Sequence, residues 1–133
     1  MKGKIVTCRD VMNQRFELVD GLKTVSEALA IMKEHDFKKV IIDKRDDNDE
    51  YGMVQLSDIA KKVIAKDRSP DRVNLYEIMA KPVVSVRPDM QLKYCARLYE
   101  NLGLSSAPVI EDQKVIGVLS YHDIVLNWLD TLD

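Results

Sequence analysis

Two short segments of this chain combine residue types that can bind a polar ligand. Gly117 is followed by Ser120 and Asp123, so that a hydroxyl and a carboxylate lie three residues apart at the end of an apolar run. An earlier segment places Gln55 and Asp58 at the same spacing, with an amide in place of the hydroxyl. Ser-x-x-Asp is also the sequence of a helix capping box, in which both side chains serve only the start of a helix. Both interpretations, ligand binding and helix capping, are open at this stage.

The chain carries none of the common catalytic motifs. A phosphate loop of the GxxxxGK[ST] kind, an HExxH helix and a Gly-rich dinucleotide fingerprint are all absent from the sequence. No nucleophile, base and orienting group can be assembled from motifs. His122 could face a phosphate, but a lone histidine at a helix start is more often a surface or capping residue, and it forms no metal motif with His35. We therefore expect no enzyme activity, no catalytic residues, no metal site and no required cofactor.

Composition indicates a soluble globular protein. Of the 133 residues, 46% are hydrophobic and 32% are charged, which is too apolar for a disordered chain. The formal net charge is −2 and the pI is about 5.7, so the overall charge does not favour direct nucleic-acid binding. No apolar run approaches the length of a membrane span, and the first residues lack the apolar core of a signal peptide. We expect a cytoplasmic protein without membrane contact.

The two cysteines do not form a recognisable site. Cys8 and Cys95 are far apart in the sequence and make no CxxC pair, so neither a disulfide scaffold nor a zinc site is indicated. We expect both thiols to be reduced. Cys95 is predicted to be a small residue of the core.

An internal repeat organises the chain. Val11-Met12 reappears as Ile78-Met79, 67 positions later. The same offset relates two apolar helix stripes, of which the first is Val25, Ala28, Leu29 and Met32 and the second is Leu92, Cys95, Ala96 and Tyr99. The repeat predicts two halves, residues 1–66 and 67–133, with the charged stretch 65–74 as the linker.

Each half is predicted to contain a strand, a helix, two strands and a closing helix. Thr24 with Glu27 caps the first long helix, whereas Pro88-Asp89 opens the second and Gly103 closes it. The predicted strands are 16–19, 40–42 and 51–54 in the first half and 83–86, 108–110 and 115–119 in the second, and the closing helices begin near Asp58 and Asp123. This is an α/β (α+β) fold. Because small open sheets bury a face against a copy, we expect a pseudo-twofold pair with a ligand cleft between the halves.

The order of these pieces resembles the CBS-domain family. Its unit has a leading Ile-Met or Val-Met, an alternating strand, a helix, a Pro-Val-type strand, and Gly-apolar-apolar-[Ser/Thr]-x-x-Asp. The second half matches this pattern closely at 78–79, 82–86, 107–110 and 117–123. The first half matches it more loosely at 11–12, 40–43 and 52–58. Since the match covers nearly the whole chain, the sequence resembles a tandem pair of CBS repeats, a Bateman module.

The resemblance implies a regulatory, energy-sensing module that binds AMP, ADP, ATP or S-adenosylmethionine. Ser120 would then lie near phosphate and Asp123 on the ribose hydroxyls, where a carboxylate can accept two hydrogen bonds from a vicinal diol. Backbone groups beside Pro108 and Val83 would read the adenine edge. The residues implied to bind the ligand are Ser120, His122, Asp123, Pro108, Val109, Val83, Gln55, Asp58 and Val40.

Two further expectations concern the number of sites and the partners. Since Gln55 replaces the hydroxyl residue, we expect the first site to be weaker than the Ser120 site for phosphorylated ligands. The closing helices carry more apolar residues than a single pair of small sheets can cover, which predicts a homodimer; these residues are Ile59, Val63, Ile64, Ile124, Val125, Trp128 and Leu129. The sequence does not identify the effector protein. The rival hypothesis is a dimerising interaction scaffold that binds no nucleotide.

Overall fold

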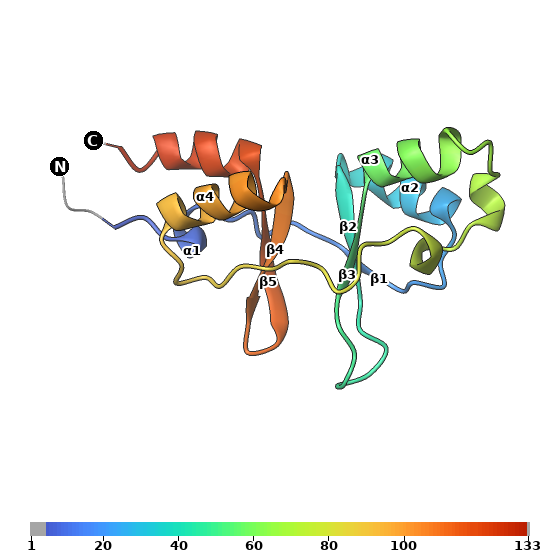
Figure 1. Cartoon of the computed structure of the whole chain (residues 1–133), viewed down its shortest axis with the longest axis horizontal. Coiled ribbons are helices and arrows are strands. Elements are labelled where there is room, and N and C mark those ends of the chain that lie inside the picture. The colour runs from blue at the N-terminus through green and yellow to red at the C-terminus, as the bar shows by residue number, and fades with distance from the viewer. Residues whose placement is uncertain (1–4, 133) are drawn as a thin grey trace. The chain divides into compact units, whose positions relative to one another are not determined.

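The computed structural model describes residues 5–132, which form two compact units (Figure 1). The continuous unit consists of residues 16–83. The split unit combines residues 5–15 with residues 84–132. Both units mix helices with a small sheet, as the sequence predicts. None of the helices within residues 5–132 has the length and apolar character needed to cross a membrane.

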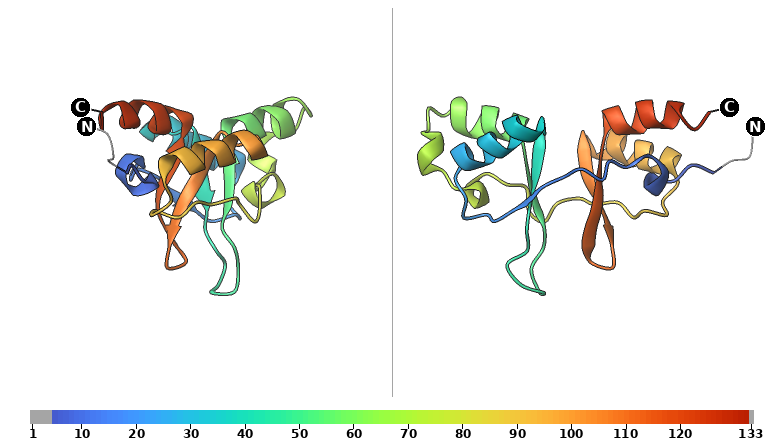
Figure 2. Two further views of the ribbon diagram at one scale, coloured as in Figure 1. Left: turned by 60° about the vertical axis from the view of Figure 1, so that its left-hand side comes forward. Right: turned by 180° about the vertical axis from the view of Figure 1, so that it is seen from behind.

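The continuous unit has a three-stranded sheet in the order β1-β2-β3, formed by Leu18–Val19, Lys39–Ile42 and Gly52–Gln55. β1 runs parallel to β2, and β2 runs antiparallel to β3. In the β2–β3 pair, Lys39 lies opposite Gln55 at one end and Ile42 lies opposite Gly52 at the other. The connection between these strands extends beyond the sheet as a long hairpin loop, which both views of Figure 2 show.

Helix α2, Val25–His35, begins where the capping-box pattern predicts. The backbone N–H of Glu27 donates to Thr24 Oγ1 at 3.2 Å, and the N–H of Thr24 donates to Glu27 Oε1 at 2.9 Å. These bonds satisfy two N–H groups that have no partner inside the helix. The predicted start of the first long helix is confirmed.

Shorter helices complete the continuous unit. α3, Leu56–Ile59, follows β3 directly and continues into the π-helix η1, Ala60–Ile64. Two 3₁₀ turns follow, η2 at Pro70–Arg72 and η3 at Leu75–Glu77. The core gathers apolar side chains from α2, all three strands, α3, η1 and the segment after it: Val19, Val25, Ala28, Met32, Val40, Ile42, Val54, Ile59, Val63, Val73, Leu75 and Ile78.

The split unit contains α1 (Cys8–Val11), α4 (Leu92–Leu102), β4 (Ser106–Glu111), β5 (Lys114–Ser120) and η4 (Asp123–Asn127). β4 and β5 form an antiparallel hairpin, whose tight turn has positive φ at Asp112 and Gln113. Its core is Cys8, Val11, Val86, Leu92, Cys95, Tyr99, Ala107, Val109, Leu119 and Ile124. The predictions that Cys95 is buried and that Gly103 ends the long helix are confirmed, and Gly103 has the left-handed φ of 66° that favours glycine.

The predicted start of the long helix in the second half is wrong. α4 begins at Leu92, after Gln91, and Pro88-Asp89 lies before it. The carbonyls of Pro88 and Met90 instead accept hydrogen bonds from the backbone N–H groups of Arg9 and Cys8, at 3.0 and 2.9 Å. The chain before α4 therefore runs beside the N-terminal segment, and this contact continues to the first residue of the helix, where the Leu92 N–H donates to Val6 O at 2.8 Å.

The segment 83–86 does not form the predicted strand. Val83 ends the continuous unit, where its N–H donates to Tyr51 O at 3.1 Å, and Val84 begins the split unit. Only Val86 pairs with the β4–β5 sheet, through a parallel bridge to Val109. A segment that leaves one unit and enters the other has no continuous partner strand, which explains the difference.

Each unit contains the leading segment of the opposite sequence repeat. Asn13 forms an antiparallel bridge with Val118 in the split unit, and Ala80 forms the same kind of bridge with Met53 in the continuous unit. The boundary between residues 66 and 67 describes the sequence repeat, and as a domain boundary it stays a prediction.

The motif glycines allow these leading segments to approach. A Cβ atom on Gly117 would lie 2.7 Å from Met12 Sδ, and one on Gly52 would lie 2.9 Å from Met79 Sδ. Both distances are too short for real contacts. Glycine at these two positions is therefore explained by packing of the leading segment against the strand.

Candidate ligand-binding site

The Ser120–Asp123 segment forms a closed set of hydrogen bonds at the end of β5. Asp123 Oδ2 accepts from the backbone N–H of Ser120 at 2.9 Å and from its hydroxyl at 3.0 Å. The N–H of Asp123 is 3.3 Å from Ser120 Oγ. This is the capping interaction that the sequence allows. It orients the carboxylate at the start of the closing helix.

Asp123 keeps the capacity to bind a ligand. The residue is only 6% exposed, and the two bonds from Ser120 both end on Oδ2. A carboxylate offers about four acceptor positions in total, so further donors can be accommodated. Helix capping and ligand binding are therefore compatible functions of one residue.

Two buried side chains hydrogen-bond the backbone next to this segment in the split unit. The Tyr99 hydroxyl donates to Leu119 O at 2.7 Å, and the Ser106 hydroxyl donates to the same carbonyl at 3.1 Å. Burial raises the pKa of Tyr99 well above its ordinary value, so this phenol stays protonated and donating. The end of β5 is thus held on its inner side by two side chains.

The Gln55–Asp58 segment repeats part of this geometry in the continuous unit. Asp58 Oδ2 accepts from the Gln55 N–H at 2.8 Å, as Asp123 does from Ser120. Its other oxygen lies 3.9 Å from Lys62 Nζ, which also donates to Ile78 O at 3.0 Å. Lys39 lies opposite Gln55 in the sheet of the continuous unit. At the equivalent place in the split unit, Ser106 lies opposite Ser120. The continuous unit therefore places more positive charge near its aspartate.

The remaining predicted site residues divide between the two units. Pro108 and Val109 lie in β4 opposite Val118 and Gly117, and the exposed His122 follows β5 in the split unit. Val40 and Val83 belong to the continuous unit.

Two of the backbone groups predicted to read adenine already have partners. Pro108 O accepts from Val86 N–H at 3.0 Å, and Val83 N–H donates to Tyr51 O at 3.1 Å. The Pro108 carbonyl keeps one lone pair for a ligand, whereas the single N–H donor of Val83 is already used by Tyr51 O.

Sequence reasoning missed one hollow. It lies at the Ile42 end of the continuous unit, has a volume of about 810 Å³, and is lined by Asp20, Arg45 and Lys81 among others. Within the residues that the structure describes, neither Gln55 nor Asp58 lines it. Its charged residues belong to segments far apart in the sequence, so no local pattern could have indicated it.

Comparison with known proteins identifies the family. The CBS domain family matches residues 8–65 and again residues 75–129. The chain therefore belongs to the CBS domain family, as a tandem pair, and is a module of the regulatory CBS-pair class. The resemblance and the fold class predicted from the sequence are confirmed.

Individual relatives agree with this assignment. The hexameric CBS-CP12 protein from bloom-forming cyanobacteria is 35% identical and has a TM-score of 0.89, with 92% of this chain and 68% of that chain covered. The uncharacterized protein MK0525 of Methanopyrus kandleri is 30% identical over 77% of this chain and 53% of its own length. The homoserine O-acetyltransferase of Methanosalsum zhilinae is 31% identical over 90% of this chain. The chain thus spans about half of the first of these curated relatives and 23% of the second.

The same fold occurs in the CBS domain pair of MJ0100, whose crystal structure is a complex with 5′-methylthioadenosine and S-adenosyl-L-methionine. That pair is 21% identical, with a TM-score of 0.82 and coverage of 97% of this chain. At this identity the likeness shows the fold alone.

Proposed function

We propose that this CBS pair binds an adenosine-containing ligand through its two aspartate segments and transmits the bound state to an effector protein. The observation that carries the proposal is the oriented, largely buried carboxylate of Asp123, which keeps acceptor positions for a ribose diol. AMP, ADP, ATP and S-adenosylmethionine are the candidates. The complex of MJ0100, a protein of the same fold, supports an adenosine compound as the class.

The proposal assigns the chain a regulatory role and no catalytic one. A match to 23% of a homoserine O-acetyltransferase is what a regulatory module attached to a separate catalytic part would produce. Signalling further requires that the ligand bind one arrangement of the protein more tightly than another, because tight binding alone shifts no equilibrium. The proposal includes a cytoplasmic location, as the sequence analysis predicts.

A homodimer is part of the same proposal. The closing helix of the split unit and the residues after it leave large apolar side chains in contact with solvent: Val125, Leu126, Trp128, Leu129 and Leu132. A hollow of about 590 Å³ beside them is lined by Val6, Leu92, Ile124 and Trp128 among others. A twofold contact would bury this patch on both copies at once. The hexameric state of CBS-CP12 supports association in this family.

A thermal-shift panel tests ligand binding. AMP, ADP, ATP, S-adenosylmethionine, 5′-methylthioadenosine and NADH would be added separately, because a ligand that binds only the folded protein stabilises it by about 2.7 kcal/mol at one hundred times its dissociation constant. We expect at least one adenosine compound to raise the melting temperature. Inosine is the matched control and should not raise it. No shift with any compound at millimolar concentration would favour the interaction scaffold.

A further inference from the structure

We propose that the continuous unit has a second ligand site, for a small organic anion with an apolar body, in the hollow at the Ile42 end of its sheet. The volume of about 810 Å³ lies within the range of small-molecule sites. Leu18, Ile42, Tyr76 and Met79 form an apolar wall, and Arg45 and Lys81 bring positive charge to the lining. This site goes beyond the proposed adenosine function and does not depend on it.

The hollow is separate from the aspartate segment of the same unit. β2 runs antiparallel to β3, with Lys39 opposite Gln55 and Ile42 opposite Gly52. Asp58 follows the Gln55 end, whereas the hollow opens beyond Ile42. The two sites are therefore separated by the length of β2, in which each residue adds about 3.3 Å. A ligand in the hollow would therefore not occupy the position proposed for adenosine.

The apolar wall is held by backbone hydrogen bonds. Tyr76 N–H donates to Gly21 O at 3.0 Å, and Leu75 N–H donates to Lys23 O at 2.9 Å. A Cβ atom on Gly21 would lie 3.3 Å from Ile42 Cγ2 and 3.4 Å from Tyr76 Cβ, so these three residues already pack closely. The loop after β1 and the turn at η3 are thus joined, and this wall exists before any ligand arrives.

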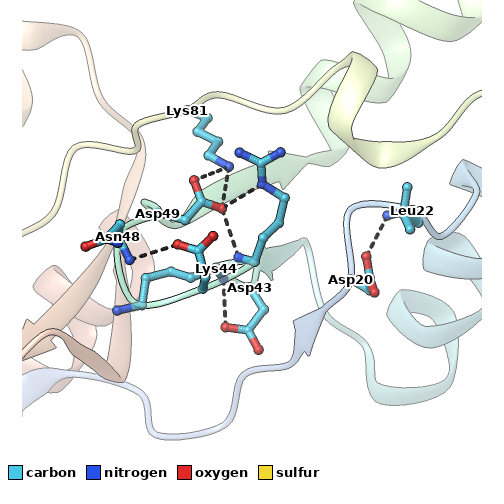
Figure 3. A network of polar contacts seen from close by, with 9 residues as sticks. Asp20, Leu22, Asp43, Lys44, Asn48, Asp49 and Lys81 are labelled. Atoms are coloured by element: carbon cyan, nitrogen blue, oxygen red, sulfur yellow. Dashed lines mark hydrogen bonds and ion pairs between the residues drawn. The ribbon is translucent and has the colours of Figure 1, made fainter.

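An ion network fixes the charged wall, as Figure 3 shows. Lys81 Nζ lies 2.8 and 2.9 Å from the two oxygens of Asp49, and Arg45 donates to Asp49 Oδ2 from its backbone N–H at 2.9 Å and from Nε at 3.2 Å. The Asp49 side chain is only 9% exposed. Hydrogen bonds from Lys81 and from the backbone lower the pKa of Asp49 well below its ordinary value, so the network stays ionised at neutral pH.

The charged residues that line the hollow include more cations than carboxylates. They are Lys44, Arg45 and Lys81, with Asp20 and Asp43. Asp43 accepts from the Lys44 N–H at 2.8 Å, and Asp20, which lies apart from the network in Figure 3, accepts from the Leu22 N–H at 2.9 Å. Asp49, which pairs with Arg45 and Lys81, stands behind these two cations and is not one of the lining residues.

Arg45 is suited to receive the anion. Its side-chain contact with Asp49 uses Nε, and the guanidinium carries four more N–H donors on its terminal nitrogens. These donors can bind a carboxylate or a phosphate in a fork-like geometry. The apolar wall then accommodates the body of the molecule. Both a carboxylate and a phosphate ester fit this description, and competition between the two distinguishes them.

Titration with 1-anilinonaphthalene-8-sulfonate, an aromatic body with one anionic group, tests the site. Fluorescence gives the affinity, and ¹⁵N chemical shifts give the location. We expect shifts at Gly21, Leu22, Arg45 and Tyr76, and displacement of the probe by 1-naphthyl phosphate or by 1-naphthylacetate. The tighter of these two competitors identifies the preferred anionic group.

Three variants decide the outcome. Arg45→Gln, at a side chain that is 82% exposed, should fold normally and weaken probe binding about fivefold to tenfold. Tyr76→Ala should weaken it through the apolar wall. Arg68→Gln is the matched control, because Arg68 also pairs with a carboxylate in this unit, Glu77 at 2.8 Å, but does not line the hollow.

Unchanged affinity in both Arg45→Gln and Tyr76→Ala would overturn the proposal, as would shifts confined to the closing helix around Trp128. AMP or S-adenosylmethionine should not displace the probe, and Asp123→Ala should leave its affinity unaltered. The two proposals can therefore fail independently.

Discussion

Ser120 and Asp123 hold each other at the junction of β5 and the closing helix, through bonds of 2.9 and 3.0 Å to a single carboxylate oxygen. This pair starts a helix and also stands where the ligand is proposed to bind. A change at Asp123 will therefore affect both stability and ligand affinity, and the experiments must separate the two effects.

Asp123→Ala should weaken binding of an adenosine ligand by about 1–3 kcal/mol, because hydrogen bonds to a charged group are lost. It should also reduce the free energy of unfolding by about 1 kcal/mol through loss of the cap. Calorimetry and chemical denaturation measure the two effects. Glu27→Ala is the control, since it removes the equivalent carboxylate from the capping box of α2. Glu27→Ala should lower the free energy of unfolding and leave the ligand affinity unchanged. If Asp123→Ala binds the ligand as tightly as the wild type does, Asp123 is not part of the site.

The two aspartate segments should bind phosphorylated ligands unequally. Gln55 lacks the hydroxyl that Ser120 offers, so Gln55→Thr should strengthen the weaker site and Gln55→Ala should not. Calorimetry with ATP should show two affinities in the wild type. The prediction would be contradicted if the two affinities were equal, or if Asp58→Ala abolished binding at the tighter site. Lys39, which lies opposite Gln55, would then be the residue to change next.

Trp128→Asp should convert the proposed dimer into a folded monomer. Trp128 is 41% exposed in the single chain, so a charge there can be solvated in the monomer but would be buried in a dimer contact. Light scattering at micromolar concentration measures the mass. Leu22→Asp, at an exposed apolar side chain of the other unit, is the control and should leave the mass unchanged. A wild-type mass near 15.2 kDa would rule out the dimer.

Gly117→Ala should destabilise the protein by about 1–3 kcal/mol through overpacking. The new methyl would lie 2.7 Å from Met12 Sδ and 3.1 Å from Asn13 O. Met12→Ala in the same chain should recover part of the loss by removing the sulfur, although the backbone oxygen stays close. A double-mutant cycle from denaturation curves measures this coupling. Additive effects would show that Met12 does not pack on Gly117 in solution.

Tyr99→Phe should cost about 0.5–1.5 kcal/mol at neutral pH, since one buried hydrogen bond is lost while Ser106 still bonds Leu119 O. The pKa of Tyr99 is raised by burial above its ordinary value of 10.0. The stabilisation is therefore complete below pH 10 and falls as the pH rises further, because the unfolded chain loses the proton first. Between pH 7 and pH 10.5, the free energy of unfolding measured by denaturation should fall less for Tyr99→Phe than for the wild type. An equal loss would place the alkaline sensitivity elsewhere.

Signals contained within a few residues predicted their structures well. The capping box at Thr24 and Glu27, the apolar stripe of α2 and the αL glycine at Gly103 each depend on contacts inside one turn or one helix. The repeat then identified the family, because two copies in order are much more specific than one. The Ser120–Asp123 pair was also evident, since a capping box is a local interaction.

The tertiary structure decided how these local pieces are combined. Pro88-Asp89 does not open α4 because the chain there bonds to Arg9 and Cys8, and no pattern near residue 88 contains that contact. The pairing of Asn13 with Val118 and of Ala80 with Met53, which places each leading segment in the unit of the other repeat, also joins residues far apart in the sequence. The bond between Lys81 and Asp49 beside the hollow is of the same kind. Such contacts depend on which surfaces remain to be buried after the local elements form, and the packing of the whole chain determines that.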